Sequence, residues 1–346
     1  MDISIIIPTY NRLWSLPRAI ESCRNSKCSI EIIVIDDGSS DGTWEWLQKQ
    51  SDVVAIKQSN WGKPWAVNKA FQNARGKYIR FLDSDDWISP NSNDRQFTLA
   101  EQKNADLVVS GYEVYNESEE LIRIQEWVEC DDFIAQQLGE CDSSHYSAFL
   151  FKRELIKDIP HRTSFAAPCF ASRDDRCFML EVALANPKIA VDSQPALCHR
   201  HHDKGRLQFS KSLNDVGTNL QHLLIYQRIL GELDARGKLT LRRKKASIKA
   251  LWNLAHWIAR THLDEACKVA EWIYQLDPDF IPNNPGILGK LYQSLGFRNT
   301  EKILKLRRIL VDFISQKPRS LQLSFNSSIA HIKAWFEQKN LLNTAK

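Results

Sequence analysis

The chain has 346 residues, of which 43% are hydrophobic and 25% are charged. This length indicates about two domains, and this composition excludes wholesale disorder. The formal net charge of +4 hides an uneven distribution, because residues 205–346 contain 23 Lys and Arg but 11 Asp and Glu, whereas the preceding residues have an acidic excess. An acidic N-terminal part is therefore joined to a basic C-terminal part.

Further features of the sequence indicate the cellular compartment and the kinds of partner. No pair among the eight cysteines has the two-residue spacing of a zinc or redox site, and scattered thiols fit a reducing cytoplasm. The first residues lack a positively charged leader, and no uncharged apolar stretch approaches ~18 residues, so we expect neither a signal peptide nor a transmembrane helix. No nucleic-acid-binding fingerprint is present, and we expect no nucleic-acid partner.

Strand-like and helix-like segments alternate in the first part of the chain. Short apolar, β-branched runs predict buried strands at residues 3–7, 31–35, 53–57, 78–82 and 106–110. Helical spacing predicts helices at residues 14–25, from 43 onward, 64–75 and 92–104, with Asp41 as a cap and Gly76 as a stop. This alternation is typical of βαβ units and predicts a doubly wound α/β fold with a mostly parallel sheet.

The pattern changes in the basic part of the chain. Strand-like runs disappear, and apolar residues recur at helical spacing with Lys and Arg between them. The predicted helical segments are residues 212–234, 239–260, 263–276, 287–295 and 300–315. We therefore expect an α/β domain at residues 1–210 and a basic all-α domain at residues 211–346.

Two aspartate clusters follow predicted strands. Asp36 and Asp37 follow the second strand, and Asp83, Asp85 and Asp86 follow the fourth. Ligands of such sheets bind beyond the carboxyl ends of the strands. Carboxylates separated by one residue can hold Mg²⁺ or Mn²⁺, which would neutralise substrate phosphates. The alternative for each cluster is an acidic turn. In the first cluster the turn and the ligand site can coexist, with Asp36 shaping the turn and Asp37 facing a ligand.

Four ordered segments resemble the landmarks of glycosyltransferase family 2. They are residues 5–11 (IIIPTYN), 34–41 (VIDDGSSD), 60–76 and 78–86 (YIRFLDSDD). The resemblance covers residues 1–205 and implies a GT-A-type fold, with a nucleotide-sugar half at residues 1–110 and an acceptor half at residues 111–210. It says nothing about the basic helical part.

The resemblance implies a role for individual positions. Asp37 would hold the base, Lys63 would contact the phosphate or the base, and Asp83 would meet the ribose or the sugar. Asp85 would be the principal metal ligand. The residues expected to bind the nucleotide sugar are Pro8, Thr9, Tyr10, Asn11, Asp37, Lys63, Asp83, Ser84 and Arg200.

A further pair of carboxylates, Asp174 and Asp175, precedes an apolar helical run. The resemblance implies that Asp175 is the catalytic base, which removes a proton from the acceptor hydroxyl. Asp174 stands where the family usually has Glu. The alternative is that the pair only stabilises the start of a helix. The aromatic residues between 143 and 175, Phe165 and Phe170 among them, would form an acceptor wall or ordinary core.

Three histidines lie close together at His199, His201 and His202, with Arg200 between the first two. The family often has a Tyr-Arg-x-His element here, which implies that His202 completes the metal shell and that Arg200 helps with the diphosphate. His199 stands in place of that Tyr, so His199 and His201 remain alternative ligands. A polar loop after a strand at residues 189–192 is the alternative without a metal.

Together these patterns predict a metal-dependent, inverting glycosyltransferase of the hexosyl or N-acetylhexosaminyl type. It would use Mn²⁺ or Mg²⁺ and a nucleoside diphosphate sugar, with UDP favoured. Its acceptor would be a glycan or lipid-linked hydroxyl in surface polysaccharide or glycoconjugate synthesis. The alternatives are a non-catalytic nucleotide-sugar binding adaptor and a sugar-phosphate nucleotidyltransferase, although the latter needs a Gly-rich basic loop that residues 8–11 lack.

The basic helices allow three further interpretations. Their apolar stripes either pack as core, or form a homo-oligomer, or lie on the anionic inner face of a membrane. We expect a cytoplasmic protein. On the third interpretation, it would also contact the inner face of the membrane peripherally.

Overall fold

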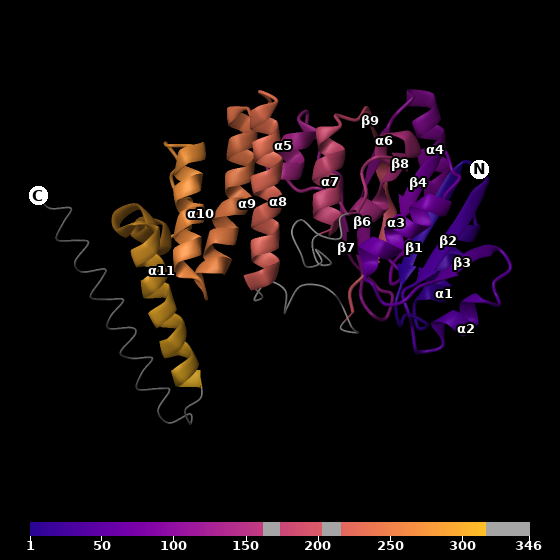
Figure 1. Ribbon diagram of the computed structural model, residues 1–346, viewed down its shortest axis with the longest axis horizontal. Coiled ribbons are helices and arrows are strands. Elements are labelled where there is room, and N and C mark those ends of the chain that lie inside the picture. Colours follow the sequence, from indigo (N-terminus) through magenta and orange to yellow (C-terminus); the bar gives the residue numbers. More distant parts are fainter. Residues whose placement is uncertain (162–173, 203–215, 316–346) are drawn as a thin grey trace, which may run out of the picture. The chain divides into compact units, whose positions relative to one another are not determined.

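The computed structural model describes residues 1–161, 174–202 and 216–315 (Figure 1). Within these residues, nine strands form one mixed sheet in the order β3-β2-β1-β4-β8-β6-β9-β5, with β7 paired to β6. The strands are β1 (Ile3–Thr9), β2 (Ile30–Asp36), β3 (Val53–Lys57), β4 (Tyr78–Phe81), β5 (Trp87–Ile88), β6 (Leu107–Tyr115), β7 (Leu121–Gln125), β8 (Leu150–Lys152) and β9 (Ile189–Arg200). All five strands predicted in the first part of the chain are present.

The sheet has a parallel half and a mixed half. β1 pairs in parallel with β2 and β4, and β2 pairs in parallel with β3. Beyond β4 the strands β8, β7 and β5 run antiparallel to their neighbours, while β6 and β9 are parallel. The prediction of an α/β fold with a mostly parallel sheet is therefore confirmed, and the aspartate clusters follow strands of its parallel half.

The helices connect these strands and continue beyond them. In the first part of the chain they are α1 (Leu16–Arg24), α2 (Thr43–Leu47), α3 (Lys63–Asn73), α4 (Ser92–Lys103), α5 (Phe133–Leu138), α6 (Arg153–Ile156) and α7 (Asp174–Leu184). The later helices are α8 (Val216–Ala235), α9 (Leu241–Ala259), α10 (Leu263–Leu276) and α11 (Ile287–Ser315). The C-terminal region is helical as predicted, and the two segments expected at 287–295 and 300–315 are one run broken at Gly296, whose φ is 73°.

Alternation along β4 places helices on both faces of the sheet. The buried Arg80 bonds Asn93 and Gln96 of α4 on one face. The ring of its neighbour Phe81 packs against Phe178 of α7 on the other face. Successive side chains of a strand point to opposite faces, so α4 and α7 cover opposite sides of β4.

Contacts divide the chain into two compact units, Met1–Trp257 and Ile258–Lys346. Within the first unit, Tyr226 of α8 donates a hydrogen bond to the carbonyl of Leu138 in α5, and Arg176 of α7 donates to the Tyr226 hydroxyl. The helices α8 and most of α9 thus pack with the sheet. The boundary near residue 211 between the α/β domain and the basic helical domain stays a prediction. None of the described helices is long and apolar enough to cross a membrane.

Gly76 has a different role from the predicted helix stop. Helix α3 already ends at Asn73, and Gly76 lies against strand β1, where its N–H donates to the Ser4 hydroxyl. A Cβ at Gly76 would lie 2.4 Å from the Ser4 backbone nitrogen. The glycine is therefore required for close packing of the α3–β4 connection on the central strand.

We expect Gly76→Ala to lower the free energy of unfolding by about 3 kcal/mol, because the clash is with backbone that cannot move aside. The matched control is Gly231→Ala in α8, where an added Cβ meets nothing within 4 Å. That change should raise stability by roughly 0.5–1 kcal/mol through helix propensity. Urea denaturation of both variants measures the difference, and equal stabilities would contradict the assignment.

Candidate active site

The carboxyl ends of β1 and β2 are joined by a network of hydrogen bonds. Asn11, at a φ of 51°, accepts from the Ser40 N–H, and its own N–H donates to the Ser39 hydroxyl. Asp36 is buried and accepts from the Ser39 N–H, while Gly38 adopts a φ of 83°. Asp36 therefore shapes the turn, as predicted for this position.

Asp37 organises the loop that leads into α3. One of its carboxylate oxygens accepts from Gln58 Nε2 and the Trp61 N–H, and the other accepts from the Gly62 N–H. The side chain lies beneath this loop, next to Thr9, whose carbonyl accepts from the Asp37 N–H. These contacts of Asp37, which the resemblance assigned to the base, fix the shape of the loop before α3.

Two polar atoms in this region are buried and lack hydrogen-bond partners within the described residues. They are Thr9 Oγ1 and Gln58 Oε1. Buried polar groups are nearly always paired, so unpaired ones at a predicted pocket indicate ligand contacts. Two further predicted residues differ in exposure: Pro8 is buried within β1, whereas Tyr10, just after the strand, is 44% exposed. Gln58 was missed in the sequence because a single Gln after a strand has no distinctive pattern.

Lys63 and Asp83 meet at the centre of the site. Lys63 opens α3, and its Nζ lies 2.6 Å from Asp83 Oδ1 and 5.4 Å from the ring centre of Tyr146. Burial alone would lower the pKa of Lys63, but Asp83, with the more distant Tyr146 and Asp174, holds that pKa well above its ordinary value. The pKa of Asp83 is lowered in turn, because the charge of Lys63 outweighs the effect of burial. Both groups are therefore charged.

Asp85 lies beside one of the three clustered histidines. His202 Nε2 is 2.9 Å from Asp85 Oδ2, and Arg12 Nε is 3.7 Å from the same oxygen. Burial would raise the pKa of Asp85, but the His202 hydrogen bond and the Arg12 charge bring it to about 2. Arg12 was missed in the sequence, since nothing in residues 8–14 indicates that its side chain reaches the loop after β4.

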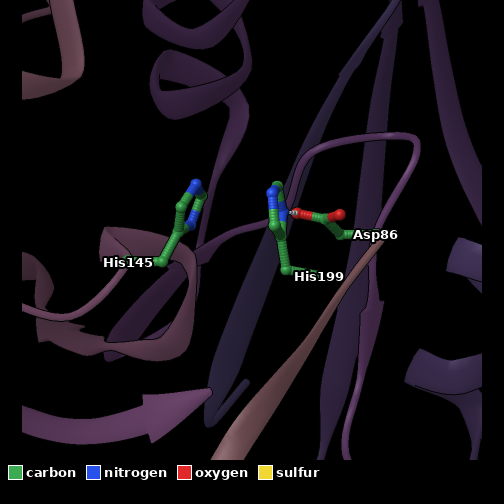
Figure 2. A group of neighbouring side chains, drawn as sticks. All are labelled: Asp86, His145 and His199. Carbon is green, nitrogen blue, oxygen red and sulfur yellow. Dashed lines mark hydrogen bonds and ion pairs between the residues drawn. The ribbon is translucent and has the colours of Figure 1, made fainter. Parts of the chain in front are cut away.

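The other two histidines lie elsewhere. His199 Nδ1 is 3.0 Å from Asp86 Oδ2, and the ring of His145 stacks on His199 with centroids 5.3 Å apart. Figure 2 shows His199 between Asp86 and His145. Ligand atoms of these three residues lie within 4.8 Å of one another. They form a stacked, hydrogen-bonded row that could hold a metal ion, besides Asp85 and His202, and the choice among the histidines stays a prediction. His201 is exposed.

Arg200 is held between two indole rings. Its guanidinium carbon lies 5.0 Å from the Trp87 ring centre and 5.7 Å from that of Trp14, and it forms an ion pair with Glu119. Its backbone N–H donates to Asp86. Arg200, the predicted diphosphate contact, therefore has a side chain with a fixed direction. It ends β9, which is longer than the strand predicted at residues 189–192.

The predicted base Asp175 and its neighbour Asp174 begin α7. Asp174 is buried and lies 3.0 Å from His161 Nδ1, whereas Asp175 is partly exposed. Both lie in the first turn of the helix, so the helix-start interpretation also holds. Residues 172 and 173, and the predicted acceptor-wall residues Phe165 and Phe170, lie outside the described residues. The described members Phe149 and Phe151 are core.

Comparison with known proteins shows which family the chain belongs to. Residues 4–175 match the family described as Glycosyl transferase family 2. A protein named as glycosyltransferase EpsH of Bacillus subtilis is 32% identical over 263 residues, which are 70% of this chain and 72% of EpsH. The chain belongs to glycosyltransferase family 2.

Another relative matches over a shorter stretch. The glycosyltransferase GlyA of Streptococcus pneumoniae is 34% identical over 122 residues, which are 34% of this chain and 18% of GlyA. Among solved structures, residues 1–349 of TarS of S. aureus in complex with UDP-GlcNAc give a TM-score of 0.52 at 16% identity, covering 88% of this chain and 92% of that one. This likeness shows a fold of the GT-A type, here with a helical C-terminal region. Membership of the family makes the protein a glycosyltransferase.

Proposed function

We propose that this enzyme is a metal-dependent inverting glycosyltransferase that moves a hexosyl or N-acetylhexosaminyl group from a nucleoside diphosphate sugar, UDP favoured, to a hydroxyl. The observation that carries the proposal is the pairing of Asp85 with His202 beside the Lys63–Asp83 ion pair. These groups lie beyond the carboxyl ends of β1, β2 and β4, where sheets of this kind bind ligands. An adaptor without catalysis would not need this arrangement of charged groups.

The geometry of Asp85 and His202 fits Mn²⁺ or Mg²⁺. Neighbouring ligands of an octahedral ion with bonds of about 2.1 Å lie about 3.0 Å apart. The observed separation of the two ligand atoms is 2.9 Å. When bound, such an ion would neutralise the charge that develops on the leaving diphosphate. Arg12 would then move from Asp85 toward phosphate oxygens, and Lys63 supplies a second positive charge.

The nucleoside part of the donor would lie against the buried polar atoms of Thr9 and Gln58. Gln58 Oε1 accepts a hydrogen bond and Thr9 Oγ1 donates or accepts one, so both could pair with a base or ribose. Asp175 would take the proton of the acceptor hydroxyl while the hydroxyl oxygen attacks the anomeric carbon. The bond from that carbon to the diphosphate breaks in the same step. Attack opposite the leaving group inverts the anomeric configuration.

The acceptor is proposed to be a glycan or a lipid-linked hydroxyl in surface polysaccharide synthesis at the cytoplasmic face of a membrane.

Not all the basic helices are free for membrane contact. Arg242 of α9 pairs with Asp131 and Glu140, and Arg243 pairs with Asp132. These charges hold α9 on the sheet domain.

Helix α11 has a different character. Ile303, Leu306 and Leu310 are 42%, 62% and 53% exposed at helical spacing, and Lys305 and Arg307 beside them are exposed. The side chains of Phe313 and Ile314, also expected in this stripe, lie outside the described residues. Apolar groups bordered by cations match an anionic bilayer surface, and we propose that α11 binds one.

Donor and metal are tested together. UDP-, GDP- and dTDP-sugars are screened for Mn²⁺-dependent hydrolysis and for a rise in Tm, because a ligand that binds the native state stabilises it. We expect Asp85→Asn to abolish the metal-dependent Tm shift while the apo Tm stays near that of wild type. Asp158→Asn at an exposed position is the control. Turnover that survives both Asp85→Asn and EDTA would exclude the metal.

For the base, we expect Asp175→Asn to reduce kcat by between about 10² and 10⁴, with little change in donor Kd, since a general base acts on the transition state. Asp174→Asn should have a smaller effect, because an amide oxygen still accepts from His161. Steady-state kinetics and donor titration measure the two parameters. Equal losses of kcat in the two variants would place the base elsewhere.

For the membrane, we expect flotation with anionic vesicles at low salt and none with neutral vesicles. The double variant Lys305→Glu/Arg307→Glu should lose at least about tenfold in binding, because each basic group near an anionic surface contributes about 1 kcal/mol. Lys49→Glu/Lys103→Glu, with the same charge change at exposed positions of the sheet domain, should bind like wild type. Equal binding of both variants would mean that α11 serves packing or oligomerisation.

A further inference from the structure

His161 connects the two helices that carry the central charged groups of the site. Its backbone N–H donates to Asn68 Oδ1 at 2.8 Å, and its carbonyl accepts from Asn68 Nδ2 at 2.6 Å. Asn68 lies on α3, whose first residue is Lys63. The imidazole of His161 lies 3.0 Å from Asp174, the first residue of α7. A continuous chain of hydrogen bonds therefore runs from α3 to the acid pair.

The imidazole has one orientation and one tautomer that fit these contacts. A carboxylate accepts hydrogen bonds, so Nδ1 carries the proton that it donates to Asp174. The ring stacks on Phe178 with centroids 4.3 Å apart and contacts Phe81 edge-on at 5.1 Å. The side chain is 2% exposed, and Nε2 is buried without a partner among the described residues. Packing thus leaves the ring one direction, toward Asp174.

We propose that His161 is a positioning residue for catalysis, which fixes the start of α7, and with it Asp175, relative to Lys63 and Asp83. This inference rests on the proposed role of Asp175 as the base. Lys63 and Asp83 lie on the donor side, and the base must reach the acceptor oxygen from the other side. A displacement of about 1 Å between them can cost about 10²-fold in rate. His161 acts on this distance through Asp174 and touches no reacting atom.

A pocket of about 390 Å³ next to His161 offers a competing interpretation. Its lining includes Trp65, Asn68, His161 and Phe178. If a ligand in this pocket were the partner of Nε2, the important atom of His161 would be Nε2 and not Nδ1. The two interpretations differ in which ring nitrogen matters, and two substitutions separate them.

His161→Asn retains a donor at the position of Nδ1, and His161→Gln retains one near the position of Nε2. We expect His161→Asn to keep kcat within about fivefold of wild type and His161→Gln to lose between about 10- and 100-fold, with unchanged donor KM in both. Hydrolysis of whichever nucleotide sugar is active with Mn²⁺ supplies the assay, and thermal unfolding confirms that both variants are folded. Equal activities, or activity retained in His161→Gln alone, would overturn the proposal.

A measurement without turnover separates this inference from the proposed function. In ¹⁵N-histidine NMR of the full chain, the resonance missing from His161→Asn identifies the residue. We expect the Nδ1-protonated tautomer in wild type and its loss in Asp174→Ala. An Nε2-protonated ring in wild type would overturn the hydrogen bond itself. With the tautomer as expected but no nucleotide sugar turned over, the proposed function would fail while the His161–Asp174 contact stood.

Discussion

The Asp86 carboxylate joins the two segments from which the charged end of the site is built. One of its oxygens accepts from the Arg200 backbone N–H, and the other faces His199 Nδ1. The loop after β4 is thereby tied to the end of β9, although 113 residues separate Asp86 from His199. With this tie in place, His202 reaches Asp85. Asp86, the most buried of the four residues from 83 to 86, thus ties the loop after β4 to the end of β9.

The charge asymmetry of the sequence has a structural explanation within the first compact unit. Acidic residues between 131 and 140 surround the start of α9, where Arg242 and Arg243 pair with them. A further ion pair joins Arg228 of α8 to Glu181 of α7. The exposed pairs of Arg242 contribute little stability individually, but with the more buried Arg243 and Arg228 pairs they select which face of the helices lies against the sheet domain. Part of the basic excess is therefore internal complementarity.

Local patterns were sufficient where neighbouring residues decide the structure. The runs at 3–7 and 31–35 are strands because β-branched residues are buried on both faces of a parallel sheet. The run at 78–82, with Ile79 as its one β-branched residue, is a buried strand too. The carboxyl ends of such strands meet at one edge, which brought the two aspartate clusters together as expected. Boundaries were less well determined: β9 continues to Arg200 because its second half pairs with β6 and β5, and those partners are remote in sequence.

The sequence alone determined the family, the α/β architecture, the helical C-terminal region and which carboxylates gather at the sheet edge, since each depends on local periodicity or on an ordered motif. The tertiary structure decided which histidine faces Asp85, that Arg12 lies beside it, that Gln58 bonds Asp37 and that His161 lies against Asp174. These residues come from loops and strand ends without a characteristic spacing. Their side chains are brought together by pairing and packing over long separations, and a pattern read along the chain does not contain that information.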